Sequence, residues 1–154
     1  MLRAITHLLT IAPDLVPDIF QRPQFTNPLA VSMGAIGGAL SRYYLSLWFV
    51  QRFSPGFPYA TLIVNFLGCF GMGLVVTLAS ERIFFLSTSA RLLVAVGFLG
   101  SFTTFSTYEL DAFNLLQARS LTLFSFYWLG SALFGIVCIF LGESLARVLA
   151  EWLG

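Results

Sequence analysis

The residues of this chain best suited to chemistry lie in the stretch Gly97–Tyr108, where two glycines and a run of hydroxyl side chains interrupt an apolar segment. In a bilayer every backbone N–H and C=O needs a partner, so such an interruption must be buried in protein or line a polar cavity. Other neutral donors occur at depth in neighbouring apolar segments: Asn65, Thr61 one helical turn before it, and Ser131. Together these groups indicate an ion or substrate path.

An aromatic side chain lies within the same polar run. Phe105 is placed between Thr104 and Ser106, so a path lined by those hydroxyls also meets its ring, whose edge carries partial positive charge. Neutral donors and ring edges suit a small hard anion that must lose its water and still leave quickly. The composition does not select the anion, and an asparagine such as Asn65 can also serve only to join helices.

Composition places these residues in a membrane protein. Hydrophobic residues make up 58% of the 154-residue chain and charged residues only 10%, whereas soluble domains are about 25% charged. The net charge of +1 gives no electrostatic footprint for nucleic acid. Cys69 and Cys138 lie in apolar segments and the single histidine, His7, lies near the N-terminus. This pattern predicts neither a disulfide, a zinc site nor an enzyme.

Four segments are long enough to cross a bilayer as helices, which takes about 20 residues each. We therefore predict an all-α integral membrane protein with four transmembrane helices, a break in the third, and both termini on one side. Residues 1–28 contain four prolines and are expected to form a surface or interfacial extension, which leaves 29–154 as the transmembrane domain. The four predicted spans are about 29–50, 57–79, 90–108 and 121–141.

The charges bear on mechanism and on orientation. The predicted spans contain no carboxylate at mid-depth, because Glu109 and Asp111 follow the third span. Proton-coupled exporters usually need an intramembrane carboxylate to carry the proton, so the chain lacks a feature of that class. Arginines divide four to three between the two sides, so the positive-inside rule gives no orientation. Either the count is noisy, or copies insert both ways and form an antiparallel homodimer. The arginines on the side of the termini are Arg22, Arg82, Arg91 and Arg147, and those opposite are Arg42, Arg52 and Arg119.

Three motifs resemble the small Fluc (CrcB) fluoride channels: Gly37–Tyr43 in the first span, Phe57–Gly68 at the second, and Gly97–Tyr108 in the third. The resemblance covers about residues 29–149. It implies an antiparallel, dual-topology homodimer with two fluoride pores. Such a dimer would passively export fluoride across the cytoplasmic (inner) membrane of a bacterium and so reduce fluoride toxicity.

The resemblance also assigns pore residues. Asn65 matches the pore asparagine, and Phe105 matches the first of two phenylalanines whose ring edges line the path. The second position is Tyr108, whose hydroxyl either adds a donor or changes selectivity, and we expect conduction to be retained. Tyr127 and Ser131 match the start of a hydroxyl track, although its next step falls at a glycine. The other polar pore residues are expected to be Thr61, Ser106 and Thr107.

In the family a structural sodium ion lies at the dimer centre, and by resemblance the backbone carbonyls of Gly100 and Thr103 from both subunits would hold it. Unwinding a helix frees carbonyls, and carbonyl oxygens suit a hard cation. Arg42 matches a family arginine, either in a vestibule where it attracts anions or as an interfacial anchor.

Two rival functions remain open at this point. A small four-helix multidrug-type transporter could also assemble antiparallel, but the first span lacks the carboxylate that it would need. A non-transporting scaffold subunit would use the glycines and polar residues only for packing. It predicts that Asn65 and Phe105 can be replaced without loss of activity.

Overall fold

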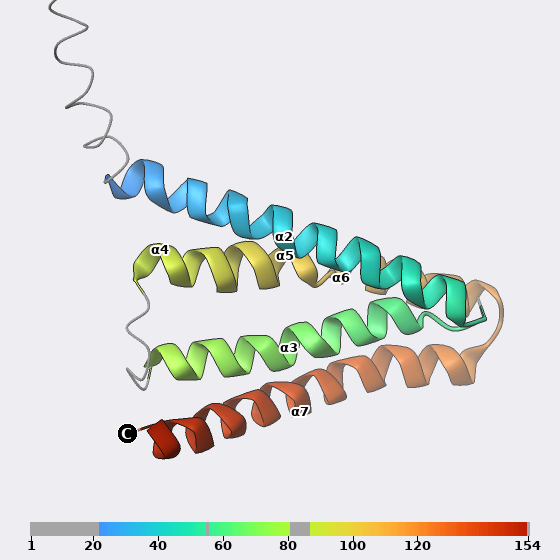
Figure 1. The fold of residues 1–154 in the computed structure, drawn as a ribbon. Helices are drawn as coiled ribbons and strands as arrows, with labels where there is room; N and C mark the ends of the chain where they lie inside the picture. Colours follow the sequence, from blue (N-terminus) through green and yellow to red (C-terminus); the bar gives the residue numbers. More distant parts are fainter. Residues whose placement is uncertain (1–21, 55, 81–86, 154) are drawn as a thin grey trace, which may run out of the picture.

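The protein is described by a computed structural model over residues 22–54, 56–80 and 87–153, so most of the expected extension and Arg82 lie outside the described residues. All of the regular structure in that part of the chain is helical (Figure 1). In order, the elements are α2 (Pro23–Arg52), α3 (Tyr59–Ser80), α4 (Thr88–Arg91), the π-helix η1 (Leu92–Leu99), α5 (Gly100–Phe102), α6 (Phe105–Gln117) and α7 (Leu121–Leu153).

The first helix begins earlier than its hydropathy predicts. α2 starts at Pro23 rather than near Leu29, because proline has the φ of a helix and its missing N–H costs nothing at the first helical position. Pro28 lies inside the same helix. The start of α2 and the C-terminal end of α7 lie at the same end of the molecule, as four antiparallel segments require (Figure 1).

In the described part of the chain, three helical stretches are long and apolar enough to cross a membrane: α3, the stretch Thr88–Gln117 that contains α4, η1, α5 and α6, and α7. This confirms a multi-pass membrane protein with three of the four predicted spans. α2 is long enough, at 30 residues, but it is less apolar than the other three stretches and is not among the helices whose length and hydropathy suit a membrane span. Its crossing of the bilayer stays a prediction.

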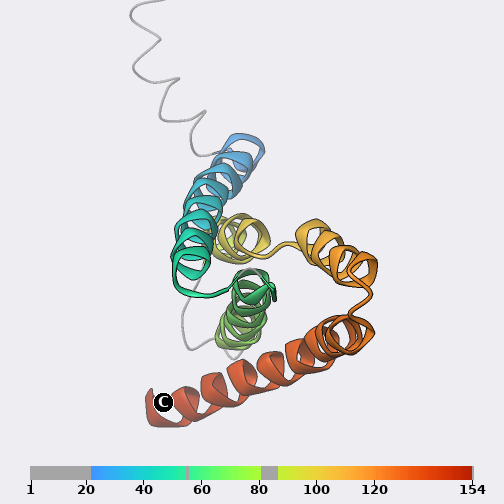
Figure 2. The ribbon, with the colours of Figure 1, turned by 90° about the vertical axis from the view of Figure 1, so that its right-hand side faces the viewer.

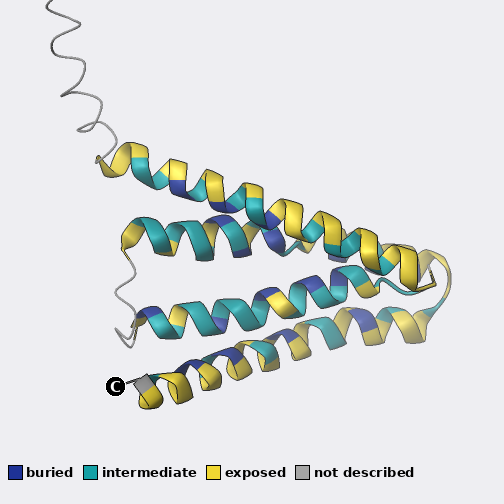
Figure 3. Cartoon of the chain, in the orientation of Figure 1, coloured by how far each residue is buried: buried dark blue, intermediate teal, exposed yellow. Residues whose placement is uncertain are grey.

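Helix α3 lies in the middle of the molecule, with α7 along one side and η1 and α2 on the other (Figure 2). Glycines allow the close approaches. A side chain at Gly38 would collide with the carbonyl oxygen of Phe98, and one at Gly73 would collide with that of Ile139. The buried residues face these contacts, while the outward faces of α2 and α7 are exposed (Figure 3).

Replacing Gly38 by alanine is expected to destabilise the fold by at least about 2 kcal/mol, because the new methyl group meets backbone that cannot move aside. Thermal unfolding in detergent measures the loss. Gly130→Ala is the matched control, since its nearest neighbour is a side-chain atom at 3.9 Å. The control should unfold at an unchanged or higher temperature, because alanine favours a helix over glycine.

Two residues with extended backbone separate α5 from α6. Thr103 has φ −79° and ψ 162°, and Thr104 has φ −151° and ψ 122°. Beyond them α6 is displaced sideways and lies beside the start of α7 (Figure 2). Because α6 continues to Gln117, Glu109 and Asp111 are helical and belong to the same stretch as the third predicted span, which extends beyond its predicted end near Tyr108.

Candidate functional site

Asn65 on α3 binds the backbone at this interruption. Its Nδ2 donates to the carbonyl oxygen of Thr104 at 3.1 Å, and its Oδ1 accepts from the N–H of Thr104 at 2.9 Å. The Thr104 side chain then caps α6, since its Oγ1 accepts from the N–H of Thr107 at 3.3 Å. The Asn65 amide and the Thr104 hydroxyl thus bond to backbone groups of Thr104 and Thr107 that have no partner within a helix. In an apolar setting such backbone groups need a partner.

The interruption leaves the backbone carbonyls of residues 100–103 without their helical donors, and for two of them the donor now bonds to a side chain. In a continuous helix the carbonyl of Gly100 would accept from the N–H of Thr104, which here donates to Asn65. The carbonyl of Thr103 would accept from the N–H of Thr107, which here donates to the Thr104 hydroxyl. These are the two carbonyls that the resemblance assigns to a cation, so their chemistry fits such an ion.

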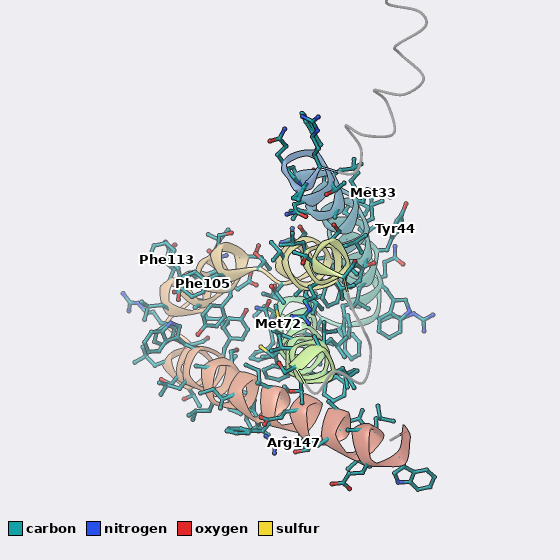
Figure 4. All side chains as sticks on the ribbon, turned by 90° about the vertical axis from the view of Figure 1, so that its left-hand side faces the viewer. Met33, Tyr44, Met72, Phe105, Phe113 and Arg147 are labelled. Carbon is teal, nitrogen blue, oxygen red and sulfur yellow. The ribbon has the colours of Figure 1, made fainter. Side chains whose placement is uncertain are left out.

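A cavity of about 630 Å³, the central cavity, lies between α3, the interruption, α6 and α7. The predicted site residues that line it are Asn65, Thr103, Phe105, Tyr108 and Ser131. Ser131 lines the cavity, and its hydroxyl is buried without a hydrogen-bond partner in the described part of the chain. Phe105 is 74% exposed, and its ring stands at the edge of the molecule away from α2 (Figure 4).

The Tyr108 hydroxyl already has an acceptor. It donates to the carbonyl oxygen of Trp128 at 2.6 Å, and its ring is buried against that of Tyr127 at 5.3 Å between centroids. The proton that could have served as an extra donor in the path is therefore directed to the backbone of α7. The ring itself remains in the lining of the central cavity.

Tyr108→Phe is accordingly expected to lower stability by about 1 kcal/mol, the net value of one hydrogen bond, and to keep ion conduction within about threefold of wild type. Thermal unfolding and liposome flux measure the two effects. Tyr44→Phe is the control for stability, because Tyr44 is 65% exposed and its hydroxyl binds nothing in the described chain. A Tyr108→Phe protein with altered anion selectivity would show that the hydroxyl faces the ion.

A second cavity of about 290 Å³, the arginine cavity, is lined by three further predicted site residues. Arg42, Thr61 and Thr107 line it, and Thr104 lines both this cavity and the central one. Arg42 brings a positive charge into a space otherwise lined by hydroxyl and apolar side chains. The two cavities therefore share Thr104, a residue of the helix interruption, in their linings.

Two predicted pore residues lie elsewhere. Ser106 is exposed on α6 and Tyr127 is fully buried, and neither residue lines the central or the arginine cavity. The Tyr127 hydroxyl donates to Asp111 Oδ2 at 3.4 Å, and Thr61 donates to the same oxygen at 2.6 Å. Asp111 was missed because α6 was expected to end at Tyr108. Its spacing of three residues from Tyr108, on one helix face, is the signal that could have found it.

Comparisons with known proteins identify relatives. A family model described as "CrcB-like protein, Camphor Resistance (CrcB)" matches residues 29–143. A curated protein of Trichormus variabilis named "Fluoride-specific ion channel FluC" is 54% identical over 136 residues, which cover 88% of this chain and 99% of that protein. A protein of the same name from a Synechococcus species is 57% identical over 126 residues, covering 82% and 96%. A third, from a Synechocystis species, is 49% identical over 121 residues, covering 79% and 92%.

Proposed function

The chain belongs to the CrcB family, and from that premise we propose that it is a fluoride-selective channel through which fluoride leaves the cytoplasm passively. The observation that carries the proposal is the similarity, over nearly their whole length, to proteins named fluoride-specific ion channels. An ion channel lowers a barrier to permeation and transforms no substrate, so the protein is not an enzyme.

The geometry supports a path through the two cavities. Arg42 attracts anions into the arginine cavity, and the threonines there offer hydroxyl donors. Beyond Thr104, the central cavity presents the Asn65 amide, the unpartnered Ser131 hydroxyl and the edge of Phe105. These three groups are neutral donors and a ring edge, which can replace the water around a small anion without holding it as tightly as a fixed charge. The carboxylate of Glu109 also lines this cavity, where it accepts a hydrogen bond from the indole N–H of Trp128 at 3.3 Å.

The proposed assembly is an antiparallel homodimer with one pore on each side. Phe105, at 74% exposure, lies on the surface of a single chain, where a partner subunit could cover it. A second copy would also enclose the helix interruption, which lipid alone does not satisfy. Such a dimer requires that copies insert both ways, in agreement with the balanced arginines, and we place it in the cytoplasmic membrane of a bacterium.

A structural sodium ion would fit between the two subunits. The carbonyls of Gly100 and Thr103 have lost their helical donors, and carbonyl oxygens are ligands that a hard monovalent cation accepts. Bound there, the ion would supply a fixed positive charge near both anion paths. This chain's own contribution is to hold the carbonyls in place, which Asn65 does through Thr104.

Growth on fluoride tests the proposal in cells. A bacterial strain without a fluoride channel should regain growth on fluoride medium when it produces this protein, and a vector-only strain should not. Protection against cationic drugs instead would favour the multidrug-type transporter. A scaffold subunit would protect against neither, although the protein is present in the membrane.

A further inference from the structure

The sulfur-containing side chains of α3 and α7 take no part in the proposed path. They are Cys69 and Met72 on α3 and Cys138 on α7. Cys69 and Met72 both line the central cavity, and they share one face of α3 because residues three positions apart are neighbours on a helix. Met72 lies on the side of α3 that faces α6 and α7 (Figure 4). One wall of the cavity therefore carries a thiol beside a thioether.

The close packing of α3 against α7 brings the second thiol near the first. A side chain at Gly73 would collide with the carbonyl oxygen of Ile139, the residue after Cys138. One turn before Gly73, the Sγ atom of Cys69 lies 3.5 Å from the place that a Cβ at Gly135 would take. Gly135 is itself three residues before Cys138 on α7. The two thiols are near enough to interact electrostatically, so both face the same contact between the helices.

Neither thiol is used by the protein itself. Both cysteines are free and half-buried, and neither side chain makes a hydrogen bond in the described part of the chain. The lone pairs of their sulfur atoms, and those of Met72, are therefore available to a ligand. Thiol and thioether sulfurs are soft, polarisable donors, which select soft metal ions such as copper(I).

The number of ligands and the charge decide which soft ion fits. Structural zinc takes four ligands, and the described residues contain no group of three or more His, Cys, Asp or Glu side chains. An apolar setting also disfavours a complex that carries a net charge. One thiolate neutralises a monovalent ion, and the second thiol and the thioether add no charge. A soft monovalent cation with two or three sulfur ligands is therefore the best match.

We propose that Cys69, Met72 and Cys138 form a binding site for a soft monovalent cation, copper(I) or its analogue silver(I). One of the two cysteines binds as a thiolate, so one proton passes to the solvent for each ion bound. The other thiol and the thioether bind as neutral sulfur ligands. This site uses sulfur, whereas the proposed sodium ion is held by carbonyl oxygens, and it does not depend on the proposed function.

Calorimetric titration of the untagged full chain with silver nitrate tests the proposal. The protein is in maltoside micelles, in a chloride-free buffer with imidazole as a competing ligand. It is freshly reduced and freed of reductant, and both of its cysteines react with maleimide before the titration. We expect one silver ion per chain and about one proton released per ion, read from the dependence of the heat on the ionisation enthalpy of the buffer. Copper(I), supplied in acetonitrile without oxygen, should displace the silver.

Four variants locate the site. Cys69→Ser and Cys138→Ser should each weaken silver binding by at least about tenfold, and Met72→Leu by about threefold. Met33→Leu is the matched control, because Met33 is 59% exposed on α2 and lies away from the central cavity (Figure 4). It should bind silver as wild type. Size-exclusion elution and thermal unfolding without silver check that each variant is folded.

Undiminished binding by either serine variant, equal affinities of the two methionine variants, or binding without proton release would each overturn the site. The absence of saturable silver binding, or silver that copper(I) does not displace, would overturn it as well. The two serine variants change different helices and nearly conserve the size of the side chain, so they do not share one folding defect.

Discussion

Replacing Phe105 by isoleucine is expected to reduce fluoride flux by at least about tenfold while leaving a folded dimer. The side chain lines the central cavity but is 74% exposed in the single chain, so its loss removes little of the packing within one subunit. Isoleucine keeps an apolar side chain of moderate size but lacks the positive ring edge that faces an anion. A loss of only about 1.4 kcal/mol of stabilisation at the top of the barrier is enough for a tenfold change.

Fluoride release from liposomes measures the effect, with size-exclusion elution of the purified variant as the check on assembly. The matched control is Phe113→Ile. Phe113 is on the same helix as Phe105 (Figure 4) and is 52% exposed, but it lines neither the central nor the arginine cavity. A Phe105→Ile dimer that conducts fully would remove Phe105 from the path and leave the resemblance without its central aromatic residue.

Changing Asn65 to aspartate is expected to suppress fluoride flux by at least about 100-fold, the largest effect of any substitution considered. Two causes act together. A carboxylate at position 65 adds a second negative charge to the central cavity, which Glu109 already lines, and it repels an anion because a charge in such an apolar setting is poorly screened. The new Oδ2 cannot donate to the carbonyl of Thr104, which loses its partner at the helix interruption. The second effect should also lower stability by about 1–3 kcal/mol.

The two causes can be separated experimentally. Asn65→Leu removes both hydrogen bonds without adding charge, so it should share the loss of stability with Asn65→Asp but repel anions less. Gln117→Glu makes the same chemical change from amide to carboxylate at the exposed end of α6, and it should conduct as wild type. Equal flux in Asn65→Asp and wild type would show that Asn65 serves only to join α3 to the interruption.

The sequence predicted the membrane class and three spans, because long apolar runs such as those in α3 and α7 allow few other structures. It missed the start of α2 and the end of α6, because both helices extend beyond the predicted spans. Pro23 was taken to oppose a helix, although at the first helical position it favours one. The third span was predicted to end near Tyr108, whereas α6 continues for nine residues to Gln117 and places the half-buried Asp111 against hydroxyls from α3 and α7.

Residue types at the site were predictable, but their partners were not. Asn65 stood out as an amide in an apolar helix, yet its partner Thr104 is 39 positions away, and only the packing of α3 against the interruption brings the two together. The Tyr108 hydroxyl likewise bonds to the backbone of α7, a contact that no local pattern encodes. The eight-residue π-helix before Gly100 also has no signal in hydropathy, since it depends on hydrogen-bond register alone.

The most direct test of the central claim is paired release of fluoride and chloride from liposomes that contain the purified protein. Each ion is loaded at the same concentration, potassium permeability is provided by an ionophore, and ion-selective electrodes follow both anions. The account predicts rapid fluoride release with chloride release no faster than from protein-free liposomes. Release of neither ion by a demonstrably inserted protein, or release of both at similar rates, would contradict a fluoride-selective channel.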